Sequence, residues 1–285
     1  MASSRGSFKD HLRGILSNEE LGLLKSSLEI IGDIAVLKVP DVLASKQAQI
    51  AVALMEWNRR IKVVMKQTSP VVEEFRIRNL SWVAGEKRTE TIHCEHGCRF
   101  RVDVAKVYFS PRLQFERRRI AGLVKPGEVV LNMFAGVGCF SILIAKRASP
   151  AKVYSVDINP AAVEYLRQNI QLNKVEGVVI PILGDAREAL SQGLTGIADR
   201  VLLPLPEKAY DYLGVAVSAL KGGGGFIHYY DFVYAKEKEE AIGKVTEKVR
   251  ERLTSLGRNF EVASARVVRT VGPNWYQVVL DLSIY

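Results

Sequence analysis

The stretch LNMFAGVGCF, residues 131–140, decides the fold together with VYSVDINP at residues 153–160. An apolar strand runs into a glycine turn that opens a helix, and a second apolar strand ends in the acid Asp157. This order is typical of an open parallel α/β sheet that binds a nucleoside outside the carboxyl ends of its strands. Gly136 and Gly138 allow the backbone to pass close to such a ligand, and Asp157 can accept hydrogen bonds from both ribose hydroxyls.

The spacing of these glycines narrows the class of nucleoside. A dinucleotide-binding turn needs G-x-G-x-x-G, and here Phe140 and Ser141 stand where a third glycine would fall. No Gly-Lys-Ser/Thr phosphate loop follows in the sequence. S-adenosylmethionine, which has a ribose and no phosphate, therefore fits better than a phosphate-bearing ligand. Asp185 ends the next strand, where it can bond an adenine amino group or, alternatively, cap the helix that begins at Ala186.

Strands and helices alternate in the second part of the chain. The parallel strands that we expect are 129–133, 152–157, 178–183, 200–203 and 225–230, with helices such as 161–172 and 207–220 between them. Two closing strands, 260–268 and 275–284, flank Gly-Pro-Asn and predict an antiparallel pair added to the parallel sheet. The predicted fold class is α/β, with a Rossmann-like sheet.

A smaller α+β domain precedes this sheet, and we place the two domains at residues 1–107 and 108–285. Its expected elements are helices at 7–24 and 44–58 and strands at 30–39, 62–64, 76–83, 90–94 and 99–103. The run HCEHGC, residues 93–98, superficially looks like a metal site. Zinc sites of this kind use two separated ligand pairs, and the sequence has no second cluster. We therefore interpret it as a hairpin turn, and expect no metal.

Composition and charge favour a nucleic-acid partner. The chain has 285 residues, a formal net charge of +9 and a sequence pI of about 9.4. The positive charge is concentrated in the first half, in Arg59, Arg60, Lys62, Lys66, Arg76, Arg78, Lys87, Arg88, Arg99, Arg101, Arg112, Arg117, Arg118 and Arg119. No apolar run is long enough to span a bilayer, the first 25 residues lack the features of a signal peptide, and the three cysteines suit a reducing compartment. We expect a cytoplasmic protein with no membrane partner.

The segment VYFSPRLQFER, residues 107–117, joins the two predicted domains and combines aromatic, basic and acidic side chains. A joint of this kind can face a cleft formed by both domains. For Glu116 the structural alternative is a salt bridge within the basic helix that follows. His228, within the apolar run FIHYY at residues 226–230, is expected to be a satisfied core residue.

At these residues the sequence resembles the archaeal and eukaryotic tRNA guanine-37 N1-methyltransferases. The motifs that carry the resemblance are YFSPRL with Glu116 three residues after Leu113, MFAGVG, VDINP, GDARE, ADRV and IHYY, and together they cover the chain from about Val71 to its end. The resemblance implies a class I methyltransferase domain that uses S-adenosylmethionine. It implies cofactor contacts from Tyr108, Arg112, Phe134, Gly136, Gly138, Asp157, Ile158 and Asp185.

The resemblance also implies that Glu116 is the general base and that Arg76 stabilises O6 of the target guanine. The chemistry agrees with these roles. N1 of guanine becomes a nucleophile only after it loses its proton, and the negative charge then moves to O6. A carboxylate directed at N1–H and a guanidinium directed at O6 meet the two needs. The implied partner is the anticodon stem-loop of a tRNA, tRNA-Phe in particular, and Trp57, Tyr108 or Phe109 can stack on the extruded base.

Two departures from the family pattern bear on the substrate. Members usually carry Asn-Leu-Pro or Asn-Pro-Pro after the fourth strand, whereas Pro204 stands here in place of the asparagine and offers no side-chain hydrogen bond. The chain is also expected to lack the extra amino-terminal domain of some relatives. The family includes enzymes that methylate C7 of 4-demethylwyosine, a tricyclic guanine derivative at the same tRNA position. We hypothesise that Pro204 enlarges or dries the pocket for that larger base.

Three functions remain open on the sequence. The first is a tRNA position-37 methyltransferase, acting on N1 of guanosine or C7 of the wyosine precursor in a monomer. The second is the aminocarboxypropyl transferase of wybutosine synthesis, which the intact run Pro111-Arg112-Leu113 disfavours. The third is a non-catalytic RNA-binding protein, against which the presence of Asp157, Asp185 and Glu116 argues.

Overall fold

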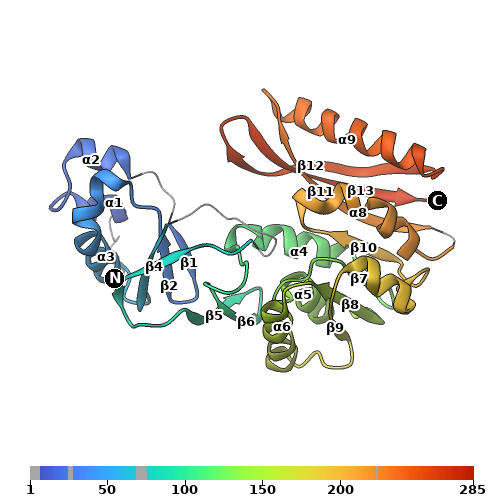
Figure 1. Cartoon of the computed structure of the whole chain (residues 1–285), viewed down its shortest axis with the longest axis horizontal. Coiled ribbons are helices and arrows are strands. Elements are labelled where there is room, and N and C mark those ends of the chain that lie inside the picture. The colour runs from blue at the N-terminus through green and yellow to red at the C-terminus, as the bar shows by residue number, and fades with distance from the viewer. Residues whose placement is uncertain (1–6, 25–27, 69–75, 223) are drawn as a thin grey trace, which may run out of the picture. The chain divides into compact units, whose positions relative to one another are not determined.

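The computed structural model describes residues 7–24, 28–68, 76–222 and 224–285. It divides into two compact units, residues 1–113 and 114–285, which we describe separately (Figure 1). Because the division falls after Leu113, Tyr108 and Arg112 belong to the first unit and Glu116 belongs to the second. Among the described residues, no helix combines the length and the apolar character needed to cross a membrane.

The first unit contains a sheet in the order β1-β2-β3-β4. Its strands are β1 (Glu29–Ile31), β2 (Ile34–Leu37), β3 (Val63–Gln67) and β4 (Leu80–Gly85). The strand expected at 30–39, with Asp33 on its turn, is two strands, because Gly32 has a φ of +57° and turns the chain beside Asp33 into an antiparallel β1–β2 hairpin. The strand expected from residue 76 begins only at Leu80, because Arg76 has a left-handed φ of +55°.

Short helices cover this sheet. They are α1 (Phe8–Leu12), α2 (Asn18–Leu23), η1 (Asp41–Lys46) and α3 (Gln47–Trp57). The single helix expected at 7–24 is wrong, because Ser17 forms a capping box with Glu20 and so starts a second helix. The core between helices and sheet is apolar and includes Leu12, Ile50, Leu54, Ala35 and Val64.

The run HCEHGC forms the turn of a hairpin, as expected. Strand β5 (Glu90–Glu95) pairs antiparallel with β6 (Cys98–Asp103), and the turn between them is His96–Gly97. His93 Nδ1 accepts a hydrogen bond from the Gly32 amide at 3.1 Å, and its ring meets Phe109 at 4.9 Å. In the described part of the chain no group of three His, Cys, Asp or Glu is arranged to hold a metal ion.

The second unit is built on a sheet in the order β12-β13-β11-β10-β7-β8-β9. The strands are β7 (Val129–Asn132), β8 (Lys152–Asp157), β9 (Val179–Leu183), β10 (Arg200–Leu203), β11 (Gly225–Tyr234), β12 (Phe260–Gly272) and β13 (Trp275–Ile284). Strands β7 to β11 pair in parallel, and β12 and β13 add the expected antiparallel pair at one edge. The α/β fold class is confirmed.

Helices lie on both faces of this sheet (Figure 1). They are α4 (Gln114–Leu123), α5 (Cys139–Ala148), α6 (Pro160–Asn173), α7 (Ala186–Ala189), η3 (Leu190–Leu194), α8 (Pro206–Ala219) and α9 (Lys238–Ser255), while η2 (Pro111–Leu113) ends the first unit. Successive side chains of a strand point to opposite faces of the sheet, so the contacts of β7 show which helices cover each face. Leu131 packs in the core with α8 and α9, whereas the next residue, Asn132, donates a hydrogen bond to Ser141 of α5 at 3.1 Å.

The strand order changes direction between β7 and β10. The chain proceeds from β7 outward to β8 and β9, then returns to β10 on the other side of β7. At such a switch point the loops leaving the two strands diverge and open a crevice at the carboxyl edge. The glycine turn after β7 and Pro204 after β10 therefore flank the position where an open sheet binds its ligand.

Candidate active site

The glycine turn after β7 leaves an open space above Gly136. Gly136 has a φ of +55°, and a Cβ built on it would meet no atom within 4 Å. Gly138 has a φ of +93° and is the N-cap of α5, but a Cβ there would lie 2.4 Å from Leu166 Cδ1. The two glycines thus serve different needs, because Gly136 gives access to the space above the turn whereas Gly138 allows the close packing of α5 on α6.

Asp157 at the end of β8 is fixed by the backbone. Its Oδ2 accepts a hydrogen bond from the Gly136 amide at 2.6 Å, and its Oδ1 accepts one from the Asn159 amide at 2.9 Å. Burial raises the pKa of Asp157 above its ordinary value, against the lowering effect of these two amides. Each carboxylate oxygen keeps a second lone pair, so Asp157 is able to accept hydrogen bonds from two vicinal hydroxyls.

Asp185 after β9 does cap the following helix. Its Oδ1 accepts a hydrogen bond from the Arg187 amide at 2.7 Å, and its Oδ2 accepts one from the Tyr212 hydroxyl at 2.5 Å. The Tyr212 ring lies between two partners, with the Arg187 guanidinium 3.9 Å from its centroid and the Phe134 ring 5.0 Å away in an edge-to-face contact. Tyr212 is thus a neighbour of this edge that the sequence motifs did not indicate.

Exposed apolar side chains stand at the same edge. Ile158, directly after β8, is 42% exposed, and Leu183, the last residue of β9, is 50% exposed. Such residues at adjacent strand ends offer contact area to a flat apolar ring. With the paired acceptors of Asp157 and the open turn at Gly136, the edge fits an adenosine group. Leu183 could have been recognised from its position two residues before Asp185.

Glu116 in the first turn of α4 is almost completely buried, with 1% exposure. Its Oε1 accepts hydrogen bonds from the Tyr230 hydroxyl and from Arg119 Nη2, both at 2.7 Å. Arg266 of β12 lies 3.6 Å from Oε2. The predicted salt bridge within the helix is therefore present, but the carboxylate also faces strand β11. Tyr230 remains protonated because burial, and then the adjacent Glu116, raise its pKa well above its ordinary value.

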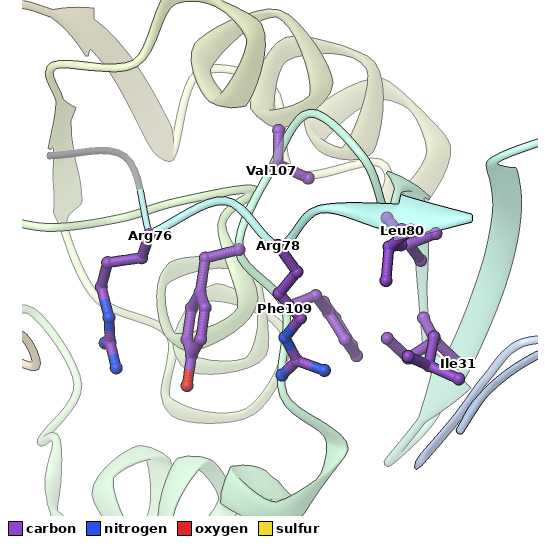
Figure 2. Close-up of a pocket in the computed structure, with 9 residues that line it drawn as sticks. Ile31, Arg76, Arg78, Leu80, Val107 and Phe109 are labelled. Carbon is purple, nitrogen blue, oxygen red and sulfur yellow. The ribbon is translucent and has the colours of Figure 1, made fainter. Parts of the chain in front are cut away.

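Residues of the first unit predicted to bind substrate or cofactor form a cluster of their own. The Arg76 guanidinium lies 4.2 Å from the centroid of the Tyr108 ring. These residues and Arg78 line a pocket with the apolar side chains of Ile31 and Leu80, and Figure 2 shows Arg76 and Arg78 extending in the same direction from one segment. Phe109 is buried, which removes it from the aromatic residues free to stack on a base.

Glu29 of β1 holds two of the arginines. It forms an ion pair with Arg78, and its Oε1 lies 3.1 Å from Arg112 Nε. No local pattern indicated this role for Glu29, because both partners are more than forty residues away.

The basic character of the first half is partly compensated inside the protein. Arg88 is paired with Asp33, Arg119 is paired with Glu116, and Arg117 is buried. Other cations lie on the surface, namely Arg59, Arg60, Lys62, Lys87, Arg99, Arg101, Arg112 and Arg118. These exposed side chains are accessible to a polyanionic partner, and two of them also form ion pairs, Arg112 with Glu29 and Arg101 with Glu90.

The second unit has the class I S-adenosylmethionine-dependent methyltransferase fold. Its marks are the parallel sheet with an added antiparallel pair and a carboxyl edge that suits adenosine. The family model "TRM5/TYW2 methyltransferase domain" matches residues 91–263, and the model "TYW2 N-terminal domain" matches residues 8–89. The chain therefore belongs to the TRM5/TYW2 methyltransferase family.

Named relatives come from both substrate branches of the family. The chain is 43% identical to tRNA (guanine(37)-N(1))-methyltransferase Trm5b of Pyrococcus abyssi, over 92% of this chain and 76% of that protein. It is 37% identical to tRNA 4-demethylwyosine(37)-methyltransferase Taw21 of Saccharolobus solfataricus, over 90% and 92%. The crystal structure of Methanocaldococcus jannaschii TYW2 in complex with AdoMet superimposes with a TM-score of 0.69 at 30% identity, over 90% and 99%.

Proposed function

We propose that this protein is an S-adenosylmethionine-dependent tRNA methyltransferase that modifies the purine at position 37, beside the anticodon. The observation that carries the proposal is the Asp157 carboxylate, held by two backbone amides next to the open turn at Gly136. The names of relatives from both branches, each a tRNA position-37 methyltransferase, support the substrate class.

The bound cofactor supplies an electrophilic methyl group on a sulfonium, so the protein has to position it. In our proposal Asp157 accepts hydrogen bonds from the ribose hydroxyls, and Asp185 accepts one from the adenine amino group. The remaining contacts that we propose come from Tyr108, Arg112, Phe134, Gly136, Gly138 and Ile158. Holding donor and acceptor in one orientation replaces a bimolecular encounter by a positioned transfer.

For transfer to guanine N1, Glu116 is the proposed general base. Its Oε1 accepts short hydrogen bonds from the Tyr230 hydroxyl and from Arg119 Nη2, both at 2.7 Å, whereas the contacts of Oε2 within the described residues are longer, 3.1 Å to Arg119 Nε and 3.6 Å to Arg266. Oε2 is thus the oxygen we assign to the N1 proton. Arg76 is the proposed partner of the O6 charge, because its guanidinium is a permanent cation that cannot compete for the proton.

Methylation at C7 of 4-demethylwyosine is the second candidate, and Pro204 favours it. Pro204 is partly buried directly after β10 and has no hydrogen-bonding side chain. It cannot hold the amide edge of an ordinary guanine, but it can contact the apolar face of a tricyclic base. The similarity to Taw21 over 92% of that protein supports the same choice.

The deciding experiment supplies S-adenosylmethionine and either an unmodified tRNA-Phe transcript or the same tRNA carrying 4-demethylwyosine. Nucleoside mass spectrometry then locates the added group. A gain of one methyl on guanosine supports N1 transfer, and a gain on the tricyclic base alone supports C7 transfer. An aminocarboxypropyl gain would assign the protein to the aminocarboxypropyl transferases of wybutosine synthesis, and no transfer to either tRNA would refute the proposal.

Glu116→Gln separates the chemical step from binding. We expect a loss of at least about 100-fold in the rate of methyl transfer to guanosine-37, with S-adenosylmethionine affinity unchanged by calorimetry. We propose further that the protein acts as a monomer and that tRNA-Phe is its substrate. Light scattering with and without tRNA tests the first point, and a panel of purified tRNAs tests the second.

A further inference from the structure

A continuous network of buried and half-buried polar groups runs from Glu116 along one face of the sheet, and the proposed mechanism uses only its first member. In this network each side chain contacts the next, in the order Glu116, Arg119, Asp281, His228, Arg200 and Glu128. Tyr230 joins it at Glu116. All of these contacts lie within the second unit. Burying so many charges is costly unless each is paired, and here each is.

Alternation along the strands places these groups on one face of the sheet. Ile227 and Tyr229 of β11 belong to the apolar core with α8 and α9, so His228 and Tyr230 project to the opposite face. Asp281 of β13, opposite His228 in the register, likewise lies between two core leucines. The motif IHYY thus supplies two polar groups to the face that faces α4.

His228 connects Arg200 to Asp281 in this network, and these two partners determine which ring nitrogen of His228 carries the proton. Arg200 Nη1 lies 2.7 Å from His228 Nε2, and because an arginine only donates, Nε2 must accept. The proton therefore sits on Nδ1, which donates to Asp281 Oδ1 at 2.6 Å. Complete burial lowers the pKa of His228, so the ring stays neutral near neutral pH.

Asp281 and Glu116 share one guanidinium. Arg119 Nη2 lies 2.7 Å from Glu116 Oε1 and 3.0 Å from Asp281 Oδ1. Burial alone would raise the pKa of Asp281, but hydrogen bonds from His228 and Arg119 hold it below its ordinary value, so it is ionised. The two carboxylates therefore compete for the positive charge of Arg119.

The same network of polar side chains binds both ends of helix α4. Glu116 in its first turn is bound by Tyr230, and the carbonyl oxygen of Leu123, its last residue, accepts a hydrogen bond from Arg200 Nη2 at 2.9 Å. Arg200 is itself fixed by the two carboxylate oxygens of Glu128, at 2.7 and 3.1 Å. Helix α4 is thus tied to strands β10, β11 and β13 at the two points that determine its direction.

We propose that Tyr230, His228 and Asp281 are positioning residues for Glu116, which they hold directly, through Arg119 and through the two ends of α4. This inference rests on the proposed role of Glu116 as the base. The charged or titratable groups that the structure records around Glu116 are Arg119 on its own helix, Tyr230 on β11, Arg266 on β12 and, through Arg119, Asp281 on β13. Helix α5 contributes the apolar ring of Phe140, 6.4 Å from the Tyr230 ring.

Two substitutions test the proposal because they should act in opposite directions. Tyr230→Phe removes a donor to the Glu116 carboxylate, which disfavours the ionised form and raises the pKa of Glu116. Asp281→Asn removes the anion that shares Arg119, which leaves more positive charge to Glu116 and lowers its pKa. We expect the titration midpoints of the two variants to lie on opposite sides of the wild-type midpoint. General loss of structure would not produce opposite displacements.

The primary measurement is a 13C NMR titration of the Glu116 carboxyl in glutamate-labelled protein, assigned with Glu116→Gln. It needs no tRNA, so it does not depend on the proposed function. The matched control is Tyr229→Phe, which deletes the same hydroxyl one residue away, where it donates to Asp231 at 2.7 Å, and should leave the titration unchanged. Displacements in the same direction, or none in either variant, overturn the proposal.

The second measurement is the rate of single-turnover methyl transfer as a function of pH. The acidic limb should move with the NMR midpoint in both variants. In a steady-state assay, His228→Leu should lower kcat about 10- to 100-fold with the KM for S-adenosylmethionine within about twofold. His228→Gln, whose amide both donates and accepts, should recover part of the loss. If Glu116→Gln retains the full rate, Glu116 is not the general base. The NMR titration still decides whether Tyr230, His228 and Asp281 position its carboxylate.

Discussion

Alanine substitution of the two glycines in the turn after β7 should separate folding from cofactor binding. Both glycines have positive φ, +55° at Gly136 and +93° at Gly138, so an alanine at either position costs about 1–2 kcal/mol of backbone strain. Only Gly138 adds a collision, because its Cβ would lie 2.4 Å from Leu166 Cδ1 and 3.0 Å from Ile142 Cδ1. Both neighbours are completely buried, so neither can rotate into free space.

Crowding of this kind in a packed core costs about 1–3 kcal/mol more. For a domain of this size that difference corresponds to about 2–12 °C in Tm. We therefore expect Gly138→Ala to melt about 2–12 °C below Gly136→Ala. Gly136→Ala, whose methyl group projects into the open space proposed for the cofactor, should instead lower S-adenosylmethionine affinity by about 10-fold or more.

Thermal unfolding followed by circular dichroism, without ligand, measures the first effect. Isothermal titration calorimetry with S-adenosylmethionine measures the second in Gly136→Ala, which remains folded at the working temperature. Equal melting temperatures for the two variants would refute the packing argument for Gly138. Wild-type affinity in Gly136→Ala would show that the cofactor does not approach this turn.

Three further predictions follow from charges in the described structure. Asp157→Asn replaces one acceptor oxygen by a donor and should weaken S-adenosylmethionine binding about 10-fold by calorimetry. Because burial raises the pKa of Asp157 above the ordinary value of 3.8, wild-type affinity should already fall at a pH above 3.8 as the solution is acidified, and the variant should lack this dependence. Asp281, whose pKa is lowered on folding, stabilises the protein above pH 3.8 and loses that effect as the pH falls; the difference in Tm between wild type and Asp281→Asn should therefore shrink in acid. Double substitution of the exposed Arg59 and Arg60 by glutamate should weaken tRNA binding and reduce the slope of log K against log salt by about 2 in filter binding, whereas a slope that does not change would place them away from the RNA.

The sheet of the second unit follows closely from the sequence. Strands β8 and β10 have the predicted bounds, and the antiparallel pair at the edge was expected from the two segments around Gly-Pro-Asn. These elements are apolar runs closed by Gly, Asp or Pro, so local pattern and final structure agree. In the small unit local signals conflict. The positive φ of Gly32 and Arg76 divides or shortens strands that a hydrophobic pattern alone would continue.

Long-range charge pairing explains what the sequence did not predict at the site. Asp157, Gly136 and Asp185 could be placed because each lies at, or a few residues after, the carboxyl end of a predicted parallel strand. The partners of Glu116 outside its own helix could not be placed, because Tyr230 is 114 residues away and Asp281 lies 162 residues from Arg119. Only the register between β11 and β13, which sets His228 opposite Asp281, brings them together.

The cost of this buried network favours a role beyond stability. An ion pair taken out of water regains its desolvation energy only with near-ideal geometry, and well-packed apolar side chains of equal volume are often as stable. The opposite face of β11 illustrates the apolar solution, with Ile227 against α8 and α9. The face toward α4 instead pairs His228 with Asp281 and, through Arg119, with Glu116. Directional hydrogen bonds fix a side chain in one orientation, which apolar packing does not do, and a base must be held in one orientation to remove a proton.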